Sequence, residues 1–212
     1  MEILDEISAK LQAGSAKKVR ELVTEALAQN VNVEEILGSL IGGMSIIGVK
    51  FKNNEVYVPE VLIAARAMNA GLEIIKPILS ETGVKPIGKV LIGTVSGDLH
   101  DIGKNLVKMM MVGAGLEVVD LGVDVSPEKF VQAVQEHSPE IVCMSALLTT
   151  TMPSMKISIE ALSNAGVRDN IIIMIGGAPV TDNYAKEIGA DIYTPDAATA
   201  AEKAKEAILA KI

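Results

Sequence analysis

Residues 90–105 read VLIGTVSGDLHDIGKN, in which a short apolar run leads through a polar loop into a helical segment. The run is short and rich in residues that favour strands, so it predicts a buried β-strand. The same order of run, loop and helical segment returns four more times along the chain. The predicted strands cover 90–95, 116–121, 141–144, 171–175 and 191–193, and the helices between them begin near Ile102, Pro127, Pro153, Thr181 and Ala197.

Five such units predict an α/β domain in which helices cover both faces of a parallel sheet. The usual arrangement at this size is a flavodoxin-like (Rossmann-type) doubly wound sheet with strand order 2-1-3-4-5. In this arrangement a ligand binds beyond the carboxyl ends of the strands, at the switch point between strands 1 and 3. The loops after strands 1, 3 and 4 are therefore the candidate binding loops.

The residues before this domain follow the apolar spacing of helices instead. A break at Gly14-Ser15 separates the first two helices. Asn32 is the expected N-cap of the third helix, with Glu35 as its capping-box partner, and Pro59 fits the first turn of the fourth. Four short helices make a small bundle, and the stretch with Gly and Pro after them is typical of a linker. We therefore expect a four-helix bundle cap at 1–80, a linker at 81–88 and the α/β domain at 89–212.

The composition excludes several classes of partner. The chain has 212 residues, 49% of them apolar, and a formal net charge of −8 without a basic run, which argues against nucleic acid as a partner. The N-terminal sequence lacks the pattern of a signal peptide, and no apolar run approaches the ~18 residues of a membrane-spanning helix. The single cysteine, Cys143, excludes an intrachain disulfide. We expect a cytoplasmic protein that binds neither membranes nor nucleic acid.

Each of the three candidate loops has an unusual composition. The loop after the first strand, 96–105, holds His100 between acidic neighbours. The loop after the third strand, 145–151, is rich in small hydroxyl residues. The loop after the fourth strand begins with Gly176-Gly177, where the missing side chains would let a bulky ligand lie against the backbone. Each feature alone is common in turns and helix caps, but together they indicate a ligand site.

The familiar ligands of this fold do not fit these loops. A dinucleotide site needs G-x-G-x-x-G and a P-loop needs G-x-x-x-x-G-K-[ST], and the sequence has neither. A receiver domain needs an aspartate at the end of the third strand, where this chain has Ser145. A zinc site needs three or four ligands, and His137 and Cys143 are not expected to converge on His100. One histidine can still supply a single axial bond to a metal that a macrocycle already holds.

Three motifs on these loops carry a resemblance to a known family. Asp98-x-His100-x-x-Gly103, Ser145-x-Leu147 and Gly176-Gly177 resemble, in this order, the cobalamin-binding module of methionine synthase and the corrinoid proteins of cobalamin-dependent methyltransferase systems. Met44-x-x-x-Gly48-x-x-Phe51 and Val58-Pro59-Glu60-Val61-Leu62 resemble that family's helical cap. The resemblance covers nearly the whole chain.

The resemblance implies that the protein binds cobalamin (as methylcobalamin, cob(I)alamin or a related corrinoid), with the nucleotide tail displaced from the metal and inserted beside Gly176-Gly177. It implies that His100 is the lower metal ligand and that Asp98 hydrogen-bonds the far ring nitrogen of His100. Thr151 stands where the family's relay often ends in a serine, and with His100 and Asp98 it is expected to take part in the chemistry. The other expected cofactor contacts are Gly97, Leu99, Asp101, Ile102, Gly103, Ser145, Leu147, Thr149, Gly176, Gly177, Ala178 and Tyr193, with Tyr57, Val61 and Met68 over the upper cobalt face.

The resemblance also implies a role. The chain is expected to be a carrier, without catalysis of its own, that shuttles a methyl group between a substrate-specific methyltransferase of barrel fold and an acceptor methyltransferase. A reductive activation protein is a third expected partner. The alternatives are a cobalamin-binding regulatory or storage module and a detached cobalamin-binding subunit of an adenosylcobalamin mutase. Mutases lack such a cap directly before the cobalamin module, and photosensing regulators use a cap tryptophan, whereas this chain has no tryptophan.

Overall fold

The computed structural model describes residues 2–82 and 86–210. The chain divides into two compact units, and the boundary in the sequence lies between Pro86 and Ile87. The last helix of the first unit continues to Thr82, so it extends into the stretch that was predicted as linker. Residues 83–85 of that linker lie outside the described residues.

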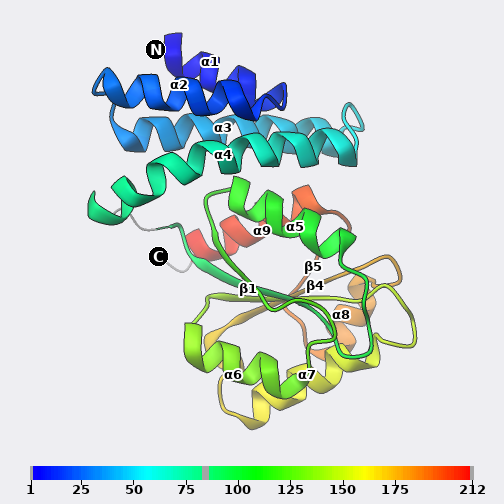
Figure 1. The fold of residues 1–212 in the computed structure, drawn as a ribbon. Helices are drawn as coiled ribbons and strands as arrows, with labels where there is room; N and C mark the ends of the chain where they lie inside the picture. Colours follow the sequence, from blue (N-terminus) through cyan, green and yellow to red (C-terminus); the bar gives the residue numbers. More distant parts are fainter. Residues whose placement is uncertain (1, 83–85, 211–212) are drawn as a thin grey trace. The chain divides into compact units, whose positions relative to one another are not determined.

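Residues 2–82 fold into the predicted four-helix unit. Helix α1 packs along α3, and α2 packs along α4 (Figure 1). The faces between them carry the apolar stripes of the sequence, because Val19 and Val23 on α2 and Leu40 and Met44 on α3 are all buried. The helices are α1 (Glu2–Gln12), α2 (Ala16–Ala28), α3 (Val33–Lys52) and α4 (Val58–Thr82).

Local signals set the ends of these helices. Gly14 has a left-handed backbone with φ +70, which ends the first helical segment where the break was predicted. The side chain of Asn32 accepts a hydrogen bond from the backbone N–H of Glu34 at 2.8 Å, so it caps α3 as predicted. The predicted capping-box partner was wrong, because Glu35 contributes only its backbone N–H, to the carbonyl of Asn32.

The second unit alternates strands and helices, as predicted. Within the described residues its five strands pair in parallel in the order β2-β1-β3-β4-β5. The elements are β1 (Lys89–Thr94), α5 (Ile102–Gly113), β2 (Glu117–Asp120), α6 (Pro127–His137), β3 (Ile141–Ser145), α7 (Pro153–Asn164), a short 3₁₀ helix (Arg168–Asn170), β4 (Ile172–Gly176), α8 (Asp182–Ile188), β5 (Ile192–Tyr193) and α9 (Ala197–Leu209).

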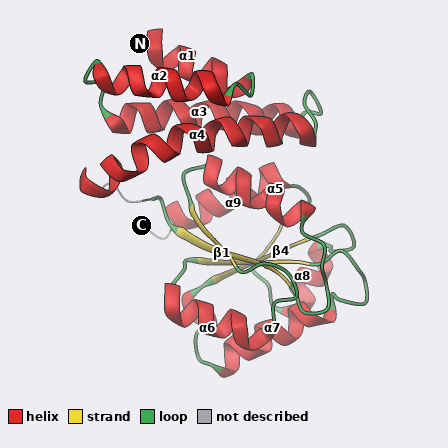
Figure 2. Ribbon diagram, in the orientation of Figure 1, coloured by secondary structure: helices red, strands yellow, loops and turns green. Residues whose placement is uncertain are grey.

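Helices cover both faces of this sheet. Figure 2 shows α5 and α9 on one side and α6, α7 and α8 on the other. Leu91, Val142 and Ile173 from the three central strands share a hydrophobic cluster with Phe130 of α6 and Met155 of α7. The central strands read as continuous apolar runs because both of their faces are buried. No helix in the described part of the chain combines the length and apolarity needed to cross a bilayer.

The register of the central strands brings three strand ends side by side. Thr94 of β1 pairs with Ser145 of β3, and Ser145 pairs with Gly176 of β4. The three candidate loops therefore leave the same edge of the sheet from adjacent positions.

Candidate functional site

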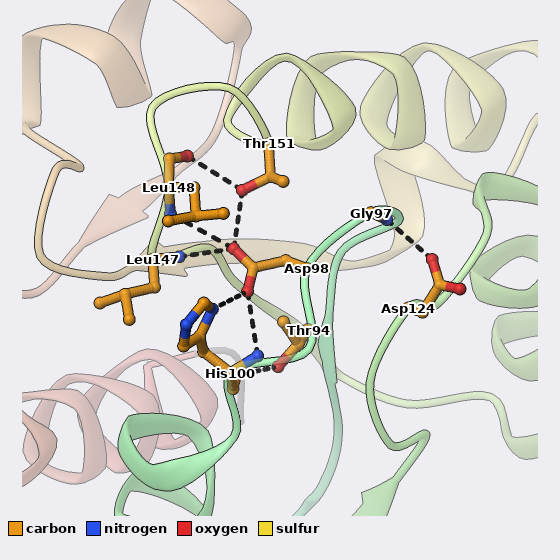
Figure 3. A network of polar contacts seen from close by, with 8 residues as sticks. All are labelled: Thr94, Gly97, Asp98, His100, Asp124, Leu147, Leu148 and Thr151. Carbon is orange, nitrogen blue, oxygen red and sulfur yellow. Dashed lines mark hydrogen bonds and ion pairs between the residues drawn. The ribbon is translucent and has the colours of Figure 1, made fainter.

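The carboxylate of Asp98 is the centre of a hydrogen-bond network between the first two of these loops (Figure 3). Asp98 is fully buried. Its Oδ2 accepts hydrogen bonds from the backbone N–H of Leu147 at 2.8 Å and of Leu148 at 3.3 Å, and from Oγ1 of Thr151 at 2.7 Å. Its Oδ1 lies 3.0 Å from the backbone nitrogen and 2.8 Å from Nδ1 of His100. The expected contacts of Asp98 with His100 and Thr151 are thus present in the structure.

These contacts keep Asp98 ionised although it is buried. Burial alone would raise the pKa of this carboxyl group. The hydrogen bonds from Thr151, from the backbone of His100 and Leu147 and from the His100 ring outweigh that effect, and the pKa of Asp98 lies well below its ordinary value. Since an ionised carboxylate can only accept hydrogen bonds, Nδ1 of His100 must carry the proton that faces it.

The other ring nitrogen of His100 is available to a ligand. The side chain is half exposed, with a relative accessibility of 50%. Within the described residues Nε2 has no hydrogen-bond partner, because the hydrogen bonds of the residue involve its backbone and Nδ1. A neutral imidazole with its proton on Nδ1 presents a lone pair on Nε2, which is the form that binds a metal.

Exposed apolar side chains occur close to His100 in the sequence and on the loop that binds Asp98. Leu99 and Ile102, on either side of His100 in the sequence, are 71% and 77% exposed. Leu147 and Leu148, whose backbone binds Asp98, are 44% and 42% exposed. No group of three or more His, Cys, Asp or Glu residues in the described ranges could hold a bare metal ion. One nitrogen ligand in an apolar surface fits a metal that is carried by a large macrocycle.

Three residues that the sequence analysis did not select hold the His100 loop in place. Oγ1 of the buried Thr94 donates to the carbonyl oxygen of His100 at 2.9 Å. Oδ1 of Asp124 accepts from the backbone N–H of Gly97 at 2.7 Å, and Oγ of Ser154 donates to the carbonyl of residue 96 at 3.0 Å. The sequence signal for Thr94 was a hydroxyl residue within an apolar run. Nothing in the local sequence points to Asp124 or Ser154.

The remaining predicted residues of the first two loops have varied surroundings. Gly97 has φ +83, and a Cβ there would lie 3.6 Å from Cγ2 of Thr151. Asp101 accepts a hydrogen bond from the side chain of Asn105 at 2.9 Å, so it supports the start of α5. Ser145 ends β3, and Thr149 is exposed. A Cβ on Gly103 would meet no atom within 4 Å, so nothing in the described structure requires glycine there.

The paired glycines of the third loop differ from each other. Gly177 has φ +137, and a Cβ there would lie 1.9 Å from the carbonyl oxygen of Ala146. The chain's own backbone therefore requires this glycine, whereas the sequence predicted that it makes space for a ligand. A Cβ on Gly176 would meet only the carbonyl of Thr194, at 3.4 Å. Ala178 is exposed on the same loop.

Gly177→Ala is expected to lower the free energy of unfolding by roughly 2–4 kcal/mol, because it adds a steric clash to a backbone conformation that disfavours side chains. Gly176→Ala is the matched control, and it should stay within about 1 kcal/mol of the wild type because its Cβ finds ordinary space. Urea unfolding followed by circular dichroism measures both. Equal stability of the two variants would contradict this assignment.

The other predicted cofactor contacts lie elsewhere. Tyr193 is partly buried and packs against the hydrophobic cluster of the sheet. In the helical unit Tyr57 is 65% exposed, but Val61 and Met68 are buried. A contact of Val61 or Met68 with a cofactor would require these side chains to become accessible, so Tyr57 is the better candidate.

The residues considered for zinc do not gather around His100. His137 is the last residue of α6. Cys143 is buried in β3, where burial raises the pKa of its thiol to about 12. A thiol that stays protonated is a poor nucleophile and a poor metal ligand.

Comparison with known proteins shows the family to which the chain belongs. A B12 binding domain family matches residues 88–204, and a second B12 binding domain family matches residues 3–76. The trimethylamine corrinoid protein of Methanosarcina barkeri is 46% identical over 191 residues, which cover 89% of this chain and 88% of that protein. Dimethylamine corrinoid protein 1 of Methanosarcina acetivorans is 39% identical over 206 residues, 97% of each chain.

Solved structures share the whole fold. The methanol:cobalamin methyltransferase complex MtaBC from Methanosarcina barkeri contains a chain with a TM-score of 0.88 and 30% identity, and the match covers 98% of this chain and 80% of that one. A cobalamin-binding protein from Desulfitobacterium hafniense DCB-2 has a TM-score of 0.80 and 30% identity, over 96% of this chain and 98% of that one. The chain therefore belongs to the B12-binding domain family of corrinoid proteins, and its cofactor is cobalamin or a related corrinoid.

Proposed function

We propose that this protein carries methyl groups on a corrinoid whose cobalt is bound from below by Nε2 of His100. The observation that supports this most directly is the pairing of His100 with Asp98. A half-exposed imidazole donates Nδ1–H to a buried, ionised carboxylate and keeps Nε2 open. When bound, the corrinoid supplies a cobalt atom that can accept and release a methyl group.

Asp98 and the groups that hold it would orient the imidazole of His100 and raise its basicity as a ligand. The contact with Asp98 fixes the tautomer of His100 and raises the basicity of Nε2. A charge-assisted hydrogen bond of this kind is worth roughly 1.5–3 kcal/mol. Thr151 and the backbone of Leu147 hold the second carboxylate oxygen, so Asp98 cannot turn away from the ring.

Gly103 offers a test of where the cofactor lies. Gly103→Leu is expected to weaken cobalamin binding about tenfold or more, a loss of ~1.4 kcal/mol or above, because the added side chain would fill space that the chain itself leaves open. The fold should tolerate it, since glycine is a poor helix former. Gly38→Leu is the matched control, because Gly38 is a helical glycine of α3 that also has no atom within 4 Å of its Cβ position. Spectroscopic titration with cobalamin measures both variants, and equal affinities would count against a corrinoid at Gly103.

The methyl donor is proposed from the relatives. Proteins with 39–46% identity to this chain are named as trimethylamine and dimethylamine corrinoid proteins. We therefore propose a methylamine-specific methyltransferase, with the barrel fold that the resemblance implies, as the first partner. An acceptor methyltransferase and a reductive activation protein complete the proposed system.

Methyl transfer to the loaded protein tests the proposal. The cobalamin-loaded chain, reduced with titanium(III), is mixed with trimethylamine and a trimethylamine methyltransferase, and methylation of the bound cofactor is followed by its absorbance. We expect methylation that requires both the enzyme and the amine. The assay is repeated with dimethylamine, monomethylamine and methanol and their methyltransferases. Failure in all four systems, while a known corrinoid protein is methylated alongside, would refute the carrier role and favour a storage module.

A further inference from the structure

We propose that Asp124 is a positioning residue for His100, because it fixes the backbone on which the Asp98 carboxylate is carried. This inference rests on the proposed role of His100 as the lower cobalt ligand. Asp124 follows β2 and lies on a different loop from His100, and its hydrogen bonds reach the His100 loop at Ser96, Gly97 and Asp98.

Asp124 binds the His100 loop at three points. Its Oδ1 accepts hydrogen bonds from the backbone N–H of Gly97 at 2.7 Å and from Oγ of Ser96 at 3.4 Å. Its own backbone N–H donates to the carbonyl oxygen of Asp98 at 3.0 Å. Figure 3 shows Asp124 on the opposite side of the loop from Thr151, which binds the Asp98 side chain. Asp98 is therefore held by its backbone from one side and by its carboxylate from the other.

The backbone at this contact is left-handed in both loops. Asp124 has φ +51 and Gly97 has φ +83. The left-handed region is unfavourable for a residue with a side chain, although aspartate and asparagine tolerate it better than most. An exposed residue that is kept in this conformation indicates a local requirement, and the two hydrogen bonds to Gly97 and Asp98 supply one.

The turn that carries Asp124 is itself anchored to the sheet. The backbone N–H of Thr94 donates to the carbonyl of Gly122 at 3.0 Å, and the N–H of Val125 donates to the carbonyl of Thr94 at 2.9 Å. Val95 and Val125 form a parallel bridge. Asp124 thus connects the His100 loop to a turn that is hydrogen-bonded to the sheet.

Loss of this contact should affect the imidazole more than the fold. Gly97 has the largest backbone freedom of any residue type, so without its acceptor the turn before Asp98 can adopt further conformations. The contact between Asp98 Oδ1 and His100 Nδ1 depends on that turn because Asp98 follows Gly97 directly. Without the Asp124 contact, we expect the Nδ1–H tautomer of His100 to be less populated and Nε2 to be less well oriented for binding cobalt.

Three variants of Asp124 separate positioning from simple turn stability. Asp124→Gly removes the acceptor and keeps a residue that accepts positive φ. Asp124→Asn keeps both the Oδ1 acceptor and the tolerance for positive φ, so it should behave like the wild type. Asp124→Ser, with a shorter polar side chain, replaces the glycine variant if that one does not fold.

The first readout uses the protein without cofactor. The chain has two histidines, so the imidazole ¹⁵N signals of His100 are identified by comparison with His137→Gln. When the ¹⁵N signals are those of the neutral imidazole, the wild type and Asp124→Asn should show His100 mainly as the Nδ1–H tautomer. Asp124→Gly should show a mixture of the two tautomers.

The second readout is the cobalt(II) EPR spectrum of the corrinoid-loaded protein. We expect the ratio of nitrogen-coupled to uncoupled cobalt to fall about tenfold in Asp124→Gly, which corresponds to ~1.4 kcal/mol, and to be retained in Asp124→Asn. An unchanged tautomer and unchanged coupling in a folded Asp124→Gly protein would overturn the proposal, even if its melting temperature drops. If the wild type shows no histidine coupling, the lower-ligand proposal fails instead, and the tautomer measurement still decides the role of Asp124.

Discussion

Replacing His100 with alanine is expected to abolish histidine coupling in the cobalt(II) EPR spectrum of the corrinoid-loaded protein. Nε2 of His100 is the imidazole nitrogen that the site leaves open, since Nδ1 is taken by Asp98. The other histidine of the chain, His137, ends α6. His137→Ala is therefore the matched control and should keep the coupling.

Isotope labelling makes this result specific to the protein. The benzimidazole of the cofactor also carries a nitrogen that can bind cobalt, so the protein is prepared with ¹⁵N-labelled histidine. Coupling to His100 then changes its splitting pattern with the label, whereas coupling to the cofactor's own base does not. A label-independent pattern in the wild type, or a label-dependent one in His100→Ala, would contradict the assignment of His100 as ligand.

Asp98→Ala is expected to lower the free energy of unfolding by roughly 3–5 kcal/mol and to weaken histidine ligation as well. The substitution leaves the backbone N–H groups of Leu147 and Leu148 without their acceptor, and the hydroxyl of Thr151 keeps only the carbonyl oxygen of Leu148, at 2.9 Å. Each buried donor without a partner costs about 1–3 kcal/mol. Asp98→Asn keeps the shape but removes the charge, so it should fall between Asp98→Ala and the wild type. Urea unfolding and the EPR spectrum of the loaded protein measure the two effects.

The contribution of Asp98 should also depend on pH. The pKa of Asp98 is lowered in the folded protein, so its stabilising effect is complete well above the unfolded value of ~3.9 and is lost as the pH falls through that value towards the lower folded pKa. The stability difference between the wild type and Asp98→Asn should therefore be largest at neutral pH and shrink below about pH 4. The exposed Asp169 provides a control, since Asp169→Asn should show no such gap. A gap for Asp98→Asn that stays constant down to acid pH would contradict this.

Much of the fold could be predicted because its signals are local. Ile102, Pro127, Pro153 and Ala197 begin their helices as predicted, and the strand order follows from the alternation of strands and helices. The edge strands β2 (Glu117–Asp120) and β5 (Ile192–Tyr193) are shorter than predicted. A strand at the edge has a pairing partner on one side only, and apolar spacing does not reveal where that pairing stops.

The site could be predicted in part. The contacts of Asp98 with His100 and Thr151 were implied by the family resemblance, and they are present. The role of Asp124 could not be read from the sequence, because its partner Gly97 is 27 positions away and no periodic pattern connects them. The sequence also does not show which atom would exclude a side chain at a glycine. Only the folded structure shows that a Cβ at residue 177 would clash with the carbonyl oxygen of Ala146.

The methyl group of Thr151 restricts rotation of the side chain that binds Asp98, since branched side chains have few allowed rotamers. This methyl lies close to Gly97, where a Cβ would come within 3.6 Å of it. Shape therefore helps to aim the hydroxyl at the carboxylate before any hydrogen bond forms. A serine in place of Thr151 could make the same bond, but it would have to give up more rotational freedom to do so. Because that loss is entropic, its effect on cofactor binding would grow as the temperature rises.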